Sequence, residues 1–209
     1  MSEQQQPIED LQHIKRMMER SSRFISLSGL SGIAAGICAL VGAWFASQKI
    51  DCWIKGDCDL SLLASAEDKL IDGLFWIATL TFIGAFLLAF FFTWLRSKKS
   101  GTPIWGATTF RLFWNTAIPI VAGGAFLIRM MQLGEYQLVP PGCLIFYGLA
   151  IVNASKYTLS EVRYLGYGQI VLGLFNLWWI GYGLQFWAMG FGVMHILYGL
   201  VMWWKYERK

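Results

Sequence analysis

Long apolar runs separated by short polar segments dominate this chain. Five runs contain no charged residue, and they occupy positions 24–47, 73–95, 112–128, 136–155 and 164–204. A transmembrane helix needs about 20 mainly apolar residues, so each of the first four runs predicts one membrane-spanning helix. The fifth run is about twice that length and must fold back on itself. Glycines and a glutamine interrupt it at Gly181–Phe186, where we expect the turn.

The pattern therefore predicts an all-α polytopic membrane protein with six transmembrane helices. The predicted spans cover 24–47, 73–95, 112–132, 138–157, 164–183 and 187–204 within a membrane domain of residues 24–205. Residues 206–209 form a short cytoplasmic tail. Residues 1–23 place Ile8, Leu11, Ile14, Met17 and Met18 on one helical face. This predicts an N-terminal amphipathic helix lying flat on the cytoplasmic membrane surface.

Composition and charge agree with this architecture and predict its orientation. The chain is 56% hydrophobic and only 14% charged, which is outside the usual range of soluble domains. All but four of its 17 Lys and Arg residues fall on the side of the N-terminus; the exceptions are Lys49, Lys55, Lys69 and Arg129. Cytoplasmic loops carry an excess of basic residues, which predicts that both termini are cytoplasmic. The net charge of +4 then faces anionic lipid, and no nucleic-acid partner is expected.

Polar residues inside the spans indicate where a ligand could bind. Asn176 and His195 lie at nearly equal distances from a turn at Gln185–Phe186, which places both near the bilayer midplane. Gln169 and Asn115 extend this polar set. Because transporter sites often lie at the midplane, the pattern predicts a site between helices 5 and 6 that binds or passes a small solute. The competing interpretation is a hydrogen bond that only fixes helix packing.

Cofactor and enzymatic chemistry find little support in the sequence. Haem at His195 is a minor hypothesis, since a second histidine inside the membrane would be needed and the other one, His13, lies in the predicted surface helix. No metal site, cofactor or catalytic motif is predicted, which favours a function other than catalysis.

The outer loop after the first span contains two cysteines in the segment DCWIKGDC. Cys52 and Cys58 are six residues apart, and a disulfide would close this small loop in an oxidising compartment. Cys38 and Cys143 fall inside predicted spans, where we expect them to pack as small apolar side chains.

Charged residues crowd the predicted cytoplasmic turn between helices 4 and 5. Lys156, Glu161 and Arg163 lie there, and Thr158 with Glu161 has the spacing of a capping box that would start helix 5 just after Thr158. One interpretation is a capped helix with basic side chains reaching the lipid surface. The alternative is a contact for a cytosolic protein partner, which would make the chain a sensory or interaction protein.

Small residues recur at intervals of four in the first span. Ser28, Gly32 and Gly36 form this series, which lets two helix backbones approach closely inside lipid. The partner helix could belong to the same chain or to a second copy, so a homo-oligomer through this face is one expectation.

Three segments carry a resemblance to other sequences. They are ERSSRFISLSGLSGI, SKYTLSEVRYLG and WAMGFGVMHILYGLVMWWKYER, at 19–33, 155–166 and 187–208. With them the chain resembles an uncharacterised family of small six-span bacterial inner-membrane proteins. The resemblance implies a location in the bacterial cytoplasmic membrane and supplies no activity.

Overall fold

A computed structural model describes residues 28–55, 63–101 and 106–208 of the chain. These residues are almost entirely helical, and no strand occurs among them. The predicted amphipathic helix in residues 1–23 and the cysteine at position 58 lie outside the described residues.

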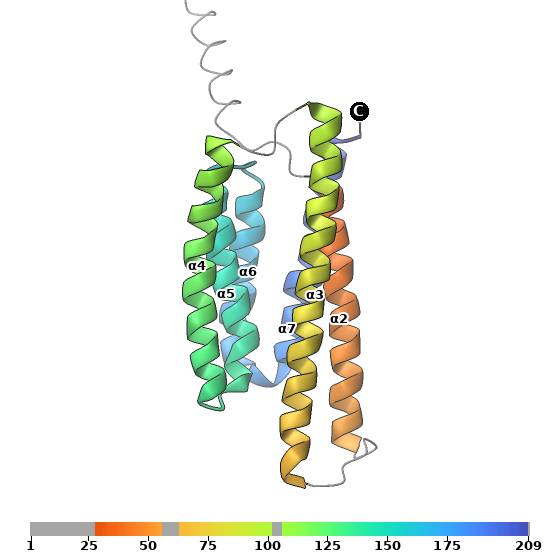
Figure 1. Ribbon diagram of the computed structural model, residues 1–209, viewed down its shortest axis with the longest axis vertical. Coiled ribbons are helices and arrows are strands. Elements are labelled where there is room, and N and C mark those ends of the chain that lie inside the picture. The colour runs from red at the N-terminus through yellow and green to blue at the C-terminus, as the bar shows by residue number, and fades with distance from the viewer. Residues whose placement is uncertain (1–27, 56–62, 102–105, 209) are drawn as a thin grey trace, which may run out of the picture.

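Six helical segments run along the bundle in alternating directions (Figure 1). They are α2 (Gly29–Lys55), α3 (Leu63–Ser100), α4 (Ala107–Gln132), α5 (Val139–Ala154) with the preceding turn η1 (Tyr136–Leu138), α6 (Val162–Trp178), and a last segment made of η2 (Ile180–Tyr182), α7 (Gly183–Trp187), the π-helical η3 (Ala188–Met194) and α8 (His195–Tyr206). Five of the six segments are long and apolar enough to cross a membrane. The sixth, α6, has 17 residues and a length of about 26 Å.

The six segments form two groups of three (Figure 1). In the α5 group, α5 packs between α4 and α6. In the α2 group, α2 packs between α3 and the last segment, η3 with α8. The short helix α7 contacts both α5 and α2 and so connects the groups at one end of the bundle.

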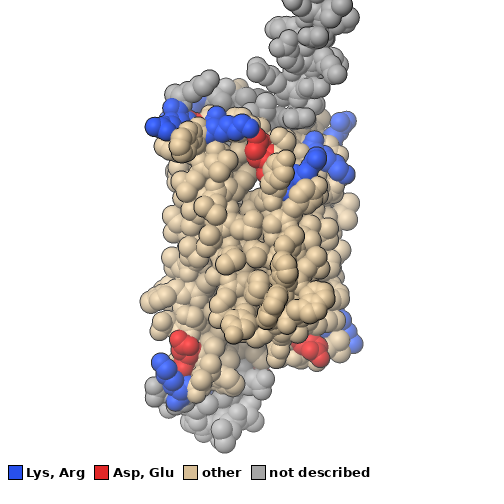
Figure 2. Space-filling model, turned by 180° about the vertical axis from the view of Figure 1, so that it is seen from behind, with Lys and Arg blue, Asp and Glu red and all other residues tan. Residues whose placement is uncertain are grey.

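A broad apolar band lies between two charged ends of the bundle, and on the face shown in Figure 2 no Lys, Arg, Asp or Glu side chain interrupts it. Large side chains of α3 and α4 are exposed in this band, such as Phe82 at 70% and Ile118 at 66%. Exposure of this extent is unfavourable in water and favourable in lipid. The described fold therefore supports the expectation of a multi-pass membrane protein.

The small residues of the first span pack inside the chain. Gly32 lies against Gly199 of α8, and a Cβ atom at Gly36 would come within 2.6 Å of the Gly192 carbonyl oxygen. Glycine is needed here because the two backbones are nearly in contact. The predicted small-residue face is thus covered by the last segment of the same chain.

Candidate functional site

Two of the predicted site residues meet in a polar cluster between the two groups. We define this cluster as Tyr147 of α5, Gln169 of α6, and Gly190 and His195 of the last segment. His195 Nε2 lies 2.7 Å from the Tyr147 hydroxyl, and His195 Nδ1 lies 3.0 Å from the Gly190 carbonyl oxygen. Gln169 Nε2 donates to the same carbonyl at 2.7 Å. The cluster therefore joins α5, α6 and the last segment at one level.

The partners of His195 determine its tautomer. The Gly190 carbonyl can only accept, so His195 Nδ1 carries the proton and donates it. Nε2 is then an acceptor for the Tyr147 hydroxyl. Gln169 Nε2 also lies 3.5 Å from Nδ1, but both atoms are donors in this arrangement and the approach is a packing contact. A neutral imidazole thus satisfies both of its ring nitrogens within the chain.

Glycine at position 190 makes room for the cluster. A Cβ atom there would lie 2.6 Å from Gln169 Oε1, so a larger residue would push the amide away. Gly190 belongs to the π-helical η3, and such segments often occur at functional positions.

The predicted pairing of Asn176 with His195 is absent from the structure. Asn176 Nδ2 donates to the Trp179 carbonyl at 3.0 Å and closes the end of α6. The reason lies in the turn, which is formed by η2 (Ile180–Tyr182) instead of Gln185–Phe186. Residue 182 is midway between positions 169 and 195, so Gln169 takes the level that we predicted for Asn176.

Two fully buried amide oxygens have no protein partner in the described part of the chain. They are Gln169 Oε1 and Asn176 Oδ1, and both residues are 0% exposed. An unpaired buried oxygen is costly, and an ordered water is its commonest partner. Gln169 Oε1 belongs to the cluster, whereas Asn176 Oδ1 lies two turns further along α6.

Asn115 contributes to a joint between α4 and α5 instead of the cluster. Pro119 has no backbone N–H, so the carbonyl of Asn115, four residues earlier, lacks its helical partner. Asn153 Nδ2 of α5 donates to this carbonyl at 2.7 Å. Sequence analysis did not identify Asn153.

A row of aromatic rings leads away from the cluster along the last segment. The Trp187 and Phe191 centroids are 5.1 Å apart, and the Phe191 and His195 rings stack with centroids 6.0 Å apart. These residues recur every four positions, which places them on one side of the segment. They connect the polar cluster to a cavity in which Trp187 forms part of the wall.

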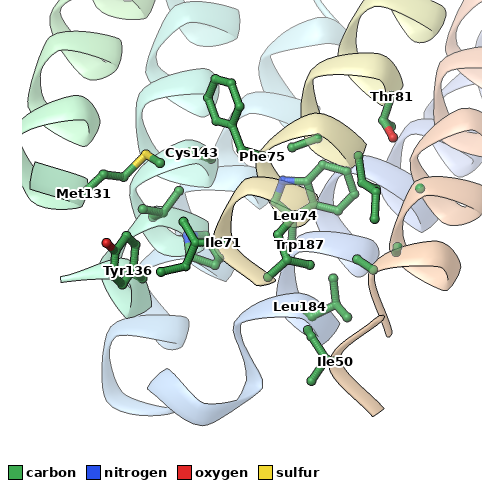
Figure 3. A pocket seen from close by; sticks show the side chains of 17 residues that line it. Ile50, Ile71, Leu74, Phe75, Thr81, Met131, Tyr136, Cys143, Leu184 and Trp187 are labelled. Atoms are coloured by element: carbon green, nitrogen blue, oxygen red, sulfur yellow. The ribbon is translucent and has the colours of Figure 1, made fainter. Parts of the chain in front are cut away.

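This cavity lies between the two groups and has a volume of about 310 Å³ (Figure 3). Helices α2 and α3 form one wall, α5 with η1 and the end of α4 form the other, and α7 closes it at one side. The lining residues are Gly42, Ala43, Ala46, Ile50, Ile71, Leu74, Phe75, Ile77, Ala78, Thr81, Met131, Tyr136, Val139, Pro140, Cys143, Leu184 and Trp187.

The cavity lining is neutral and nearly all apolar. Thr81, Tyr136, Cys143 and Trp187 provide its polar side-chain atoms, and no charged side chain lines it. Along α3 the lining extends from Ile71 to Thr81, which is about 15 Å and half of a bilayer's hydrocarbon thickness. The cavity is therefore about one leaflet deep.

Two lining residues indicate how the cavity is reached. Phe75 is 53% exposed and Tyr136 is 39% exposed, so the cavity continues to the outer surface of the bundle. These residues belong to α3 and to the turn between α4 and α5, and both lie within or beside the apolar band. The cavity therefore opens toward lipid.

At the opposite end of the bundle, three consecutive residues at the end of the last segment contact α6 of the α5 group and the other two helices of the α2 group. We call Lys205, Tyr206 and Glu207 the C-terminal clasp. Lys205 pairs with Glu161 at the start of α6, and the Tyr206 hydroxyl donates to the same carboxylate at 2.9 Å. Glu207 pairs with Arg96, and it also accepts from the Ser28 hydroxyl and the Gly29 N–H at the start of α2.

The clasp changes the interpretation of the predicted cytoplasmic turn. Helix α6 begins at Val162, and Thr158 donates to the Ala154 carbonyl at 3.3 Å, so the predicted capping box is wrong. Desolvation favours the neutral acid, but hydrogen bonds from Lys205 and Tyr206 outweigh it and lower the pKa of Glu161 to about 2. Arg163, the third charged residue of this turn after Lys156 and Glu161, donates from Nε to the Ser155 hydroxyl at 3.4 Å.

Other predicted chemistry has a limited structural basis. Among the described residues, no group of three or more His, Cys, Asp or Glu side chains is arranged to hold a metal ion. Cys52 takes part in a disulfide, while its predicted partner Cys58 lies outside the described residues. Cys38 and Cys143 are free thiols.

Sequence analysis missed Tyr147, Trp187 and Glu207. Tyr147 is near the middle of an apolar run, as an intramembrane polar residue would be, and this was the available signal. Nothing local in the sequence shows that Trp187 borders a cavity. No protein-family model, curated protein or solved structure matches the chain, so the family resemblance stays a prediction.

Proposed function

We propose that this protein is a non-enzymatic membrane protein that binds a small, neutral, lipid-soluble molecule in the cavity between its two groups of helices. The observation that carries the proposal is a cavity of about 310 Å³ that opens toward lipid and has no charged lining residue. Pockets that bind small ligands begin at about this volume.

The ligand class follows from the position of the cavity. A polar solute would lose its hydration on entering an apolar cavity and find few groups to replace the water. A molecule already dissolved in the bilayer pays no such cost. It could enter past Phe75 and Tyr136, the exposed lining residues.

A polar solute at the level of His195, our expectation from sequence, has weaker support. The ring nitrogens of His195 are paired with Tyr147 and Gly190, and Asn176 lies two turns of α6 away from Gln169. The cluster is better suited to holding helices together. We therefore favour the cavity over the midplane as the ligand site.

The proposal includes an orientation in a bacterial cytoplasmic membrane with both termini inside. Supporting it, the described Lys and Arg residues at the end where α2 begins outnumber those at the other end. On the face shown in Figure 2, several basic side chains lie along that end. They are Arg96, Lys98, Lys99, Arg111, Lys156, Arg163, Lys205 and Arg208. Cytoplasmic loops are enriched in such residues.

A cytosolic protein partner is the alternative function. Lys156 and Arg163 are exposed at the basic rim, where a partner could dock. Glu161, the third predicted contact residue, is engaged by the C-terminal clasp. Deleting residues 1–20 tests this alternative, which predicts release of a co-purifying protein from an intact bundle.

A filled-cavity variant tests the proposed function. Ala78 lines the cavity from α3, whereas Leu80 is 64% exposed on the lipid side of the same helix. Binding of tritiated decylbenzene to purified protein is measured by scintillation proximity. We expect saturable binding in wild type and Leu80→Trp, and its loss in Ala78→Trp. Equal binding by the two variants would overturn the proposal.

A further inference from the structure

We infer that the cavity ligand is a neutral flat ring that carries a carbonyl oxygen, the chemistry of a lipid-soluble quinone. This inference rests on the proposed function and specifies the ligand class. Two polar hydrogens at the cavity wall, on Trp187 and Thr81, carry the argument.

Trp187 presents a donor without an acceptor. Its indole N–H makes no hydrogen bond to any described residue, and its ring lies among the lining side chains with the nitrogen on the edge toward Phe75 (Figure 3). Trp187 is half-buried. A tryptophan N–H inside the bilayer usually pairs with an acceptor, since water is absent from the hydrocarbon interior. A ligand acceptor in the cavity would supply the missing partner.

Thr81 differs from two other threonines in these helices, Thr79 and Thr116. Thr79 donates to the Phe75 carbonyl at 2.8 Å, and Thr116 donates to the Leu112 carbonyl at 2.7 Å. This bond four residues back is the usual solution for a threonine in a transmembrane helix. The Thr81 hydroxyl makes no such bond to a described residue, although Thr81 is at the deep end of the lining.

The donors and the aromatic walls together indicate the shape and charge of the ligand. Phe75 and Trp187 offer ring faces against which a flat ring can pack. The Trp187 ring packs against Phe191 on its own segment, with ring centroids 5.1 Å apart. Its position is thus set before the ligand arrives, which reduces the entropic cost of binding.

A charged lipid headgroup fits this site poorly. No Lys, Arg, Asp or Glu side chain lines the cavity, so a phosphate or carboxylate there would be desolvated without a partner. A carbonyl needs only hydrogen-bond donors. The Trp187 N–H and the Thr81 O–H are donors of this kind, located where acyl chains would otherwise be.

Competition between two probes with the same tail tests the inference. Decylubiquinone carries ring carbonyls, and decylbenzene has a ring without them. In the wild type we expect decylubiquinone to displace tritiated decylbenzene with about tenfold higher affinity, the effect of a paired buried donor. Trp187→Phe should remove about this factor for decylubiquinone and leave decylbenzene binding unchanged.

Matched variants separate the possible results. Thr81→Val repeats the test at the second donor, and Trp76→Phe is the control because Trp76 is 62% exposed and outside the lining. Selective loss of decylubiquinone affinity in Trp187→Phe or Thr81→Val supports the inference. Equal affinity of both probes in all four proteins, or an equal loss of both probes, overturns it. The proposed function survives either result if wild type binds decylbenzene, and it fails if wild type binds neither probe.

Discussion

The polar cluster and the cavity lie at neighbouring levels of the same interface, yet they use opposite chemistry. At the cluster, hydrogen bonds centred on His195 link α5, α6 and the last segment. At the cavity, about 12 Å along the last segment at Trp187, the walls are apolar and a space remains. The difference shows that the two groups are held together at one level and separated at the next.

The C-terminal clasp extends this contrast. Lys205 and Tyr206 join the two groups at the basic end through Glu161, whereas Glu207 holds Arg96 and the start of α2 to the last segment within the α2 group. The hydrogen bonds and ion pairs that hold the two groups together are therefore concentrated in the half of the bundle away from the cavity. The half that contains the cavity depends on apolar packing and on the short helix α7.

Removing the imidazole should have the largest effect on stability. His195→Ala leaves the Tyr147 hydroxyl and the Gly190 carbonyl without this partner and creates a void, so we expect a loss of about 2 kcal/mol in the free energy of unfolding. Thermal unfolding in detergent measures it. Val193→Ala, at a position 43% exposed to lipid, is the control. A change in His195→Ala no larger than in this control would contradict a holding role for the cluster.

Neutralising Glu207 should have the next largest effect. Glu207→Gln weakens the ion pair with Arg96 and removes a negative charge from the start of α2, at an expected cost of about 1 kcal/mol. Glu135→Gln changes an acid at the opposite end, where no ion pair involves it among the described residues. Similar unfolding temperatures for both variants would argue against the clasp.

Acid should weaken the other half of the clasp by a smaller amount. The pKa of Glu161 is lowered from 4.5 to about 2 by Lys205 and Tyr206. A lowered pKa means that the carboxylate adds its full stabilisation above pH 4.5 and loses it progressively as the pH falls toward 2. At pH 7 we expect the free energy of unfolding of wild type to exceed that of Glu161→Gln by less than about 1 kcal/mol. A gap that persisted unchanged at pH 2 would contradict this assignment.

Conservative change at the cavity should have the smallest effect on stability. Trp187→Phe keeps the ring and its contact with Phe191, and the lost N–H has no partner among the described residues. We expect its free energy of unfolding to stay within about 0.5 kcal/mol of wild type in the absence of ligand. A large drop in the unfolding temperature of Trp187→Phe would show that the indole N–H is already paired within the protein.

Sequence periodicity predicted much of the fold because it reports on single segments. The apolar runs located the helices, and the length of 164–204 required a turn within it. The exact turn was harder to place, because glycines at 181 and 183 permit it at either side of Tyr182. That shift of about one helical turn exchanged Asn176 for Gln169 beside His195.

The cavity could not be predicted from the sequence. Its walls come from segments far apart in the chain, such as Ala43 and Cys143, and none has a local pattern that distinguishes a cavity wall from a packed core. Similarly, Asn153 becomes important only because α5 brings it to the carbonyl freed by Pro119. Both features depend on how helices meet, which residue spacing within one helix does not report.

The most direct test of the cavity as a ligand site is to map where a neutral photolabel attaches. An alkylated phenyldiazirine is added to membranes that contain the protein, and the labelled peptides are identified by mass spectrometry. Our account predicts labelling at the shielded cavity residues Ala43 and Cys143 that disappears in Ala78→Trp and remains in Leu80→Trp. Labelling confined to the outer faces of α3 and α4, and equal in both variants, would contradict it.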